Sequence, residues 1–242
     1  MSGEHVFSDA LFTRPCSCAM VTDGVKRIRR GEPTPNAERA NILCRHHNST
    51  LTELDQLAGK IANFQARAND EHFQDTLYVE GELLERWLLK TVVNVAAAGW
   101  AGRRKWLPSP DIVAAIFGHT PVPDGVGLFS VDGVDRNLHP QVGVSFTPIL
   151  LNDAEGPRLL GAYVTVHGMP LFAALDTALV ATLESGATPS LSRQFSDDGL
   201  RHIYRPGAII MSRKRGRPVI IGLSWNGLLY FANGTTSSLP VQ

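Results

Sequence analysis

Residues 80–99 read EGELLERWLLKTVVNVAAAG, and no other stretch of the chain has a clearer helical periodicity. Its main apolar residues recur at spacings of three and four, which places them on one helical face. They are Leu84, Trp87, Leu88, Val92 and Val95. Gly99 is a typical helix terminator. The stretch therefore predicts a helix from about residue 80 to residue 98.

Two further helices are predicted on either side of this one. Between residues 46 and 65 the apolar positions again follow a helical spacing, and Thr52 with Asp55 resembles a capping signal that would start the helix near residue 53. A short helix is predicted over 110–117, because Ser109 can cap its first turn and Pro110 suits the first helical position.

After residue 119 the pattern changes to short apolar and β-branched runs separated by Gly, Pro, Asn and Asp. Such runs are typical of strands joined by turns, so we predict a mostly antiparallel β region. The runs cover residues 142–146, 159–166, 202–204, 208–211, 219–223 and 228–232. The chain as a whole is predicted to be α+β, with a small N-terminal module over 1–66, a helical region over 67–118 and a β-rich domain over 119–242.

The composition is that of a folded chain without a uniform charge. Its 242 residues are 43% hydrophobic, which is enough for a sizeable core. Lys plus Arg and Asp plus Glu both number 23, and this balance excludes a uniformly basic nucleic-acid binder. Three cysteines argue against a disulfide scaffold. With neither a signal-peptide pattern nor an apolar run of about 18 residues, we expect a cytoplasmic protein without membrane spans.

Potential metal ligands gather in the N-terminal part of the chain. Glu4 and His5 are adjacent, and together they offer a hard oxygen ligand and a base that titrates near neutral pH. Cys44 and His47 have the spacing of the second half of a zinc knuckle, and Asn48 adds a neutral oxygen ligand. A metal that polarises a phosphate, with a histidine that activates water, suffices for phosphodiester hydrolysis.

This segment resembles the HNH nuclease family, in a variant that has Glu-His-Val followed by Asn-x-Leu-Cys-x-x-His-Asn-x-x-Leu-x-x-Leu-Asp. The chain has EHV over residues 4–6 and NILCRHHNSTLTELD over residues 41–55. The resemblance covers about the first quarter of the chain. It implies a small ββα-metal module, in which a two-stranded ribbon and the helix after it grip one divalent metal.

The resemblance also implies a role for each matching residue. His5 matches the general base that activates water, and Glu4 beside it matches a metal ligand. Asn41 matches the residue that orients the base. Asn48 matches the third residue of the His-Asn-His motif, so this chain has a His-Asn-Asn version. Mg²⁺ or Mn²⁺ would be the catalytic ion. Nucleic acid, with DNA favoured, would be the substrate.

Many members of the family also carry a structural zinc ion, and Cys44 with His47 matches the second pair of its ligands. Such members place a Cys-x-x-Cys pair before Glu-His. Here either that pair is encoded upstream of this sequence, or Cys16 and Cys18 replace it, and His46 is an alternative to His47. Two other functions stay open: a degenerate zinc-binding module that serves as a nucleic-acid or protein interaction protein, and an ordinary α+β protein with an accidental motif.

Charged residues are segregated along the sequence. We expect two basic clusters to contact nucleic acid, and a third lies at 103–105. The last cluster contains Arg-Gly-Arg-Pro, which matches the core of an AT-hook, but its place between two predicted strands favours a hairpin tip. The acidic residues between 70 and 85 are interpreted as a solvated helix face with an adjoining loop. The two basic clusters comprise Lys26, Arg27, Arg29, Arg30, Arg213, Lys214, Arg215 and Arg217.

Overall fold

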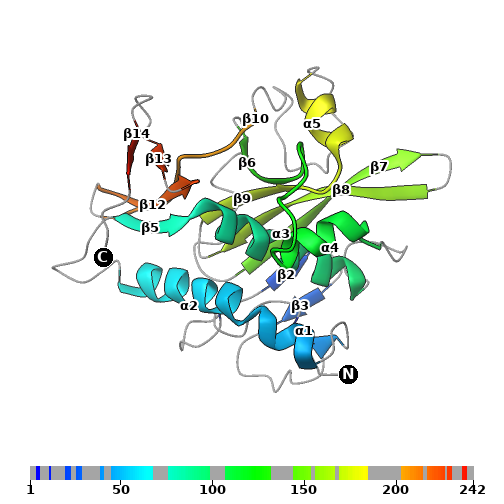
Figure 1. Ribbon diagram of the computed structural model, residues 1–242, viewed down its shortest axis with the longest axis horizontal. Coiled ribbons are helices and arrows are strands. Elements are labelled where there is room, and N and C mark those ends of the chain that lie inside the picture. The colour runs from blue at the N-terminus through cyan, green and yellow to red at the C-terminus, as the bar shows by residue number, and fades with distance from the viewer. Residues whose placement is uncertain are drawn as a thin grey trace.

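The fold combines helices with mainly antiparallel sheets, which confirms an α+β protein (Figure 1). The computed structural model describes residues 4–5, 11, 20–22, 26–28, 39–40, 45–67, 76–98, 107–131, 144–153, 156–166, 169–184, 203–214, 217–226, 228–230 and 236–238. No helix in these ranges is both long enough and apolar enough to cross a membrane.

The larger sheet has seven strands within the described residues, in the order β10-β6-β9-β8-β7-β2-β3. Neighbouring strands are antiparallel except β2 and β7, which run parallel. Residues before position 30 therefore extend the sheet formed by the C-terminal half of the chain. The strands are β2 (Met20–Thr22), β3 (Lys26–Ile28), β6 (Gly127–Val131), β7 (Val144–Asp153), β8 (Gly156–Val166), β9 (Met169–Ala174) and β10 (Ile203–Tyr204).

A smaller sheet is built around β12 (Arg217–Trp225), which pairs in antiparallel with β11 (Ala208–Lys214). Lys214 lies opposite Arg217, so β11 and β12 form a hairpin, as predicted; Arg215 and Gly216 are outside the described residues. Strand β5 (Thr76–Glu80), which the sequence analysis did not predict, pairs in parallel with β12. The sheet continues through β13 (Leu228–Tyr230) and β14 (Thr236–Ser238).

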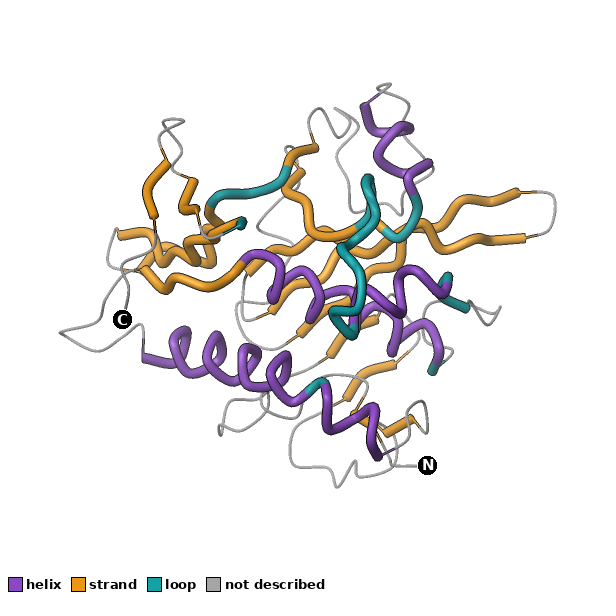
Figure 2. Tube along the Cα trace, in the orientation of Figure 1, coloured by secondary structure: helices purple, strands orange, loops and turns teal. Residues whose placement is uncertain are grey.

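Helix α3 (Gly81–Ala97) lies across one face of the larger sheet and confirms the helix predicted over 80–98 (Figure 2). Its predicted stripe is buried, and so are Leu89, Val93 and Ala96. The helix is therefore buried on nearly all sides, because α2 (Thr52–Arg67) covers the side that faces away from the sheet. The larger hydrophobic cluster among the described residues thus contains residues from all three predicted parts of the chain.

The other helices follow their local signals. The predicted helix over 46–65 is divided at the buried Leu51 into α1 (Arg45–Thr50) and α2. Helix α4 (Pro110–Ile116) starts as predicted, since Ser109 Oγ accepts a hydrogen bond from the Ile112 N–H at 3.3 Å. Helix α5 (Thr177–Glu184) was not predicted. It packs on the opposite face of the larger sheet, where Leu179 joins a second apolar cluster.

A buried ion pair connects α2 with α3. Lys90 is only 3% exposed, and its Nζ lies 2.9 Å from Oδ1 of Asp55. A buried cation that loses its carboxylate partner is destabilising. We expect Asp55→Ala to lower the free energy of unfolding by about 2 kcal/mol, less than for a fully buried pair because Asp55 is 35% exposed. Urea denaturation measures the change.

The control for this prediction is a double-variant cycle with Lys90→Met. The double variant should recover most of the stability that Asp55→Ala loses, because methionine fills the site without a charge. Equal losses in the single and double variants would contradict a role for the ion pair.

Candidate functional site

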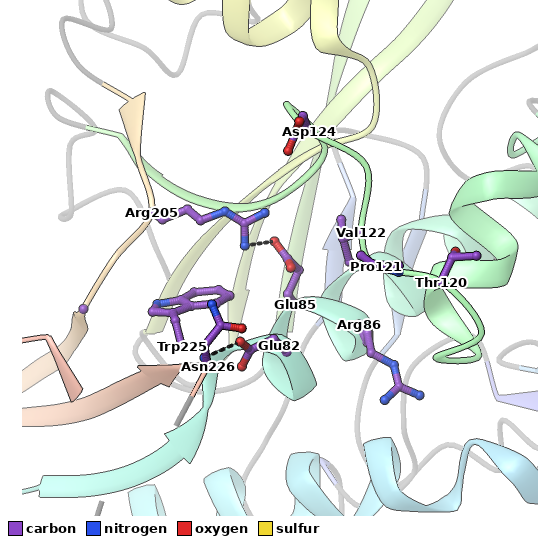
Figure 3. Close-up of a pocket in the computed structure, with 11 residues that line it drawn as sticks. Glu82, Glu85, Arg86, Thr120, Pro121, Val122, Asp124, Arg205, Trp225 and Asn226 are labelled. Carbon is purple, nitrogen blue, oxygen red and sulfur yellow. Dashed lines mark hydrogen bonds and ion pairs between the residues drawn. The ribbon is translucent and has the colours of Figure 1, made fainter. Parts of the chain in front are cut away.

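A cavity of about 590 Å³ lies where four segments of the chain meet. The first turns of α3 form one wall, and the loop between α4 and β6 forms another (Figure 3). The segment before β11 and the end of β12 complete it. Five charged side chains line this cavity: Glu82, Glu85, Arg86, Asp124 and Arg205. Such a concentration of charge around a cavity of ligand size marks it as a candidate binding site.

Glu85 is the most deeply buried of these charges, with 2% of its side chain exposed. Its Oε1 accepts a hydrogen bond from the Leu128 N–H at 2.9 Å and lies 2.8 Å from Nη1 of Arg205. Gly127 makes this approach possible, because a Cβ on Gly127 would lie 1.9 Å from the same oxygen. The carboxylate therefore ties the start of β6 to α3.

Arg205 is held in place by aromatic rings as well as by Glu85. Its Cζ lies 4.9 Å from the centre of the Trp225 ring and 5.7 Å from that of Phe129. Trp225 is itself fixed, since its Nε1 donates to the Pro206 carbonyl at 2.8 Å and its ring lies close against Gly81. The guanidinium is thus preorganised at the rim of the cavity, 39% exposed.

The remaining charged side chains hold the walls of the cavity together. Oε1 of Glu82 accepts a hydrogen bond from the N–H of Asn226, at 2.6 Å, and so joins α3 to the turn after β12. Arg86 donates from Nε to the Ile116 carbonyl at 3.1 Å, which attaches α3 to the end of α4. In Figure 3 the Arg86 guanidinium points away from the Glu85–Arg205 pair.

The burial of Glu85 is a correction to the sequence analysis. We interpreted the acidic residues between 70 and 85 as a solvated face, and for Glu85 this is wrong. A usable signal was present, because Leu88 and Leu89 stand three and four positions later and place Glu85 on an apolar side of the helix. Arg205 stood alone in the sequence, and no local pattern indicated its role.

Burial raises the pKa of Glu85 above its ordinary value of 4.5, and the negative charge of Glu82 adds to this rise. The positive charge of Arg205 and the hydrogen bonds from Leu128 and Arg205 lower the pKa and so oppose it. The folded protein then binds more protons than the unfolded chain between pH 4.5 and the raised pKa, so the contribution of Glu85 to stability falls as pH increases through this window.

Glu85→Gln removes this titration. We expect the free energy of unfolding of the wild type, minus that of the variant, to decrease across the window. Urea unfolding at several pH values tests this, and a constant difference would contradict it.

The residues of the predicted nuclease site are only partly within the described chain. Glu4 and His5 form β1, which pairs in antiparallel with β4 (Arg39–Ala40), so that Glu4 is opposite Ala40 and His5 is opposite Arg39. Asn48 lies in α1, without a described side chain. Predicted site residues outside the described residues are Cys16, Cys18, Asn41, Cys44, Arg29, Arg30 and Arg215.

His47 is exposed on α1, and its ring contacts the end of α4. The centre of its ring is 5.2 Å from that of Phe117 and 5.7 Å from that of His46. Phe117 stacks in turn near His119, with the ring centres 6.1 Å apart. Among the side chains that the structure describes, no three potential ligands gather into a metal-binding group; those of Glu4 and His5 are not in this set.

The basic residues predicted to contact nucleic acid lie on two separate strand pairs. Lys26 and Arg27 belong to β3, the last strand of the larger sheet within the described residues. Arg213 and Lys214 end β11, and Arg217 begins β12. The backbone therefore gathers these last three residues at one end of a hairpin.

No protein-family model, curated protein or solved structure matches this chain. Any assignment of function therefore depends on the chemistry of its own residues.

Proposed function

We propose that the chain is a metal-dependent nuclease of the HNH type, which hydrolyses phosphodiester bonds in nucleic acid and prefers DNA. One observation supports this most directly. The two strands β1 and β4 pair as an antiparallel ribbon, and α1 begins five residues after Ala40. This strand-strand-helix order is the one that the motif implies.

The donor types in this segment suit a hard divalent ion. Glu4 offers a carboxylate and Asn48 an amide oxygen, which are ligand types that Mg²⁺ and Mn²⁺ accept. A bound divalent ion would stabilise the negative charge that develops on the phosphate. In the proposed reaction His5 removes a proton from the attacking water, and Asn41 holds the imidazole of His5 in position.

A second metal has a structural role in this proposal. Cys44 and His47, together with Cys16 and Cys18, would bind zinc in the tetrahedral arrangement usual for structural sites. Zinc in such sites contributes directly to folding.

Cleavage assays with the purified full chain test the proposal. Linear and supercoiled DNA, and RNA, are incubated with Mg²⁺ or Mn²⁺, with EDTA as the control, and zinc content is measured by atomic absorption. Cleavage that EDTA abolishes would support the nuclease. Bound zinc without cleavage would indicate the interaction module instead, whereas neither zinc nor cleavage would contradict both.

A further inference from the structure

The cavity beside α3 uses none of the residues assigned to the proposed nuclease, so its function is a separate question. At about 590 Å³ it is within the range of small-molecule sites. Pro121 and Val122 form an apolar part of its wall, and they lie beside Glu85 in Figure 3. Its size and mixed lining suit a ligand with both a ring and polar groups.

Glu85 presents a hydrogen-bond acceptor to this cavity. Both of its hydrogen-bonded contacts, with Leu128 and Arg205, are made by Oε1. The other oxygen, Oε2, makes no hydrogen bond or ion pair with a described residue, and Glu85 lines the cavity. Both oxygens of an ionised carboxylate can accept hydrogen bonds. A ligand N–H would supply a donor for Oε2.

Arg205 presents hydrogen-bond donors immediately beside this acceptor. A guanidinium has five N–H bonds, and among the described residues only Nη1 of Arg205 has a carboxylate partner. The rings of Trp225 and Phe129 restrict its orientation, so the side chain loses less conformational entropy when a ligand binds. A ligand carbonyl oxygen would accept from these donors.

The charges around the pair favour a neutral ligand. Glu82 and Asp124 also line the cavity and would repel a phosphate or a carboxylate. The Arg205 guanidinium would repel a compact cation at Glu85, from which it is only 2.8 Å away. An uncharged group with adjacent donor and acceptor meets neither penalty.

We propose that the cavity binds a planar heterocycle through a lactam edge, in which a ring N–H donates to Glu85 and the neighbouring C=O accepts from Arg205. Hypoxanthine, guanine and uracil have this edge. Adenine and cytosine do not, because their ring nitrogen at that position is an acceptor. Purine and pyrimidine bases can present the same lactam edge, and the binding experiment distinguishes between the two classes of base.

Isothermal titration calorimetry of the wild-type full chain tests the proposal with inosine, guanosine and uridine. Adenosine, cytidine and 1-methylinosine, which lack the ring N–H, should bind at least about tenfold more weakly. Tighter binding of inosine and guanosine would identify a purine site, and tighter binding of uridine a pyrimidine site. Equal binding of inosine and 1-methylinosine, or no binding of any lactam nucleoside at millimolar concentration, would overturn the proposal.

A pair of variants locates the site. Glu85→Gln should weaken binding of the preferred nucleoside at least about tenfold, because the amide replaces a charged acceptor. Glu53→Gln makes the same change at an exposed position on α2 and should bind as the wild type does. Equal affinity in the two variants would overturn the assignment to this cavity. None of these measurements depends on nuclease activity, so the two proposals fail independently.

Discussion

His5→Ala is expected to lower metal-dependent cleavage of DNA by at least about 100-fold, the contribution that a general base usually makes. His5 belongs to the two-residue strand β1, which pairs with β4 in a sheet separate from the two larger ones. Its loss should therefore leave the thermal midpoint of unfolding nearly unchanged. Initial cleavage rates with Mg²⁺ and Mn²⁺ measure the effect.

His119→Ala is the matched control for this variant. His119 is an exposed histidine that follows α4, outside the segment that carries the motif. Its removal should leave the cleavage rate within about twofold of the wild type, as expected for an exposed residue that has no role in the proposed reaction. Similar rates for the two variants would rule out His5 as the general base, even if the protein cleaves DNA.

Gly127→Ala is expected to produce the largest loss of stability, about 3 kcal/mol or more. Gly127 has φ of 120°, which L side chains rarely adopt. Its Cβ would also displace the Glu85 carboxylate, at 1.9 Å from Oε1. The buried charge would then be separated from both the Leu128 N–H and Arg205, its two partners. Urea denaturation and the thermal midpoint measure the loss.

Gly125→Ala separates backbone strain from the clash. Gly125 also has positive φ, at 71°, but its nearest neighbour would be the Thr177 methyl group at 3.0 Å rather than a buried carboxylate. We expect a smaller loss, about 1–2 kcal/mol. If Gly125→Ala destabilises as much as Gly127→Ala, the contact with Glu85 is not what makes glycine necessary at position 127.

Several elements could be predicted because their signals are local. The stripe in α3 identified a helix without knowledge of its neighbours, and Ser109 with Pro110 identified the start of α4. The hairpin of β11 and β12 followed from turn residues between two apolar runs. These signals all act within a few residues, where the backbone conformation is set by the side chains themselves.

Other elements could not be predicted because neighbours override their local pattern. Strand β9 reads MPLFAA and is buried on both faces, so it lacks the alternation that marks a half-buried strand. Helix α5 lies within a region rich in strands, and its start depends on one side chain, since Asp176 Oδ1 accepts from the Ala178 N–H at 2.8 Å. Strand β5 exists through parallel pairing with β12, far along the chain.

The sequence by itself determined the positions of α3 and α4, and it grouped the candidate metal ligands near the start of the chain. Only the tertiary structure decided that Glu85 is buried and that a cavity adjoins it. The Leu128 N–H that binds Glu85 is 43 positions away, and the Asn226 N–H that binds Glu82 is 144 positions away. No local pattern encodes such pairs, because the free energy of a buried charge depends on groups that only the completed fold brings beside it.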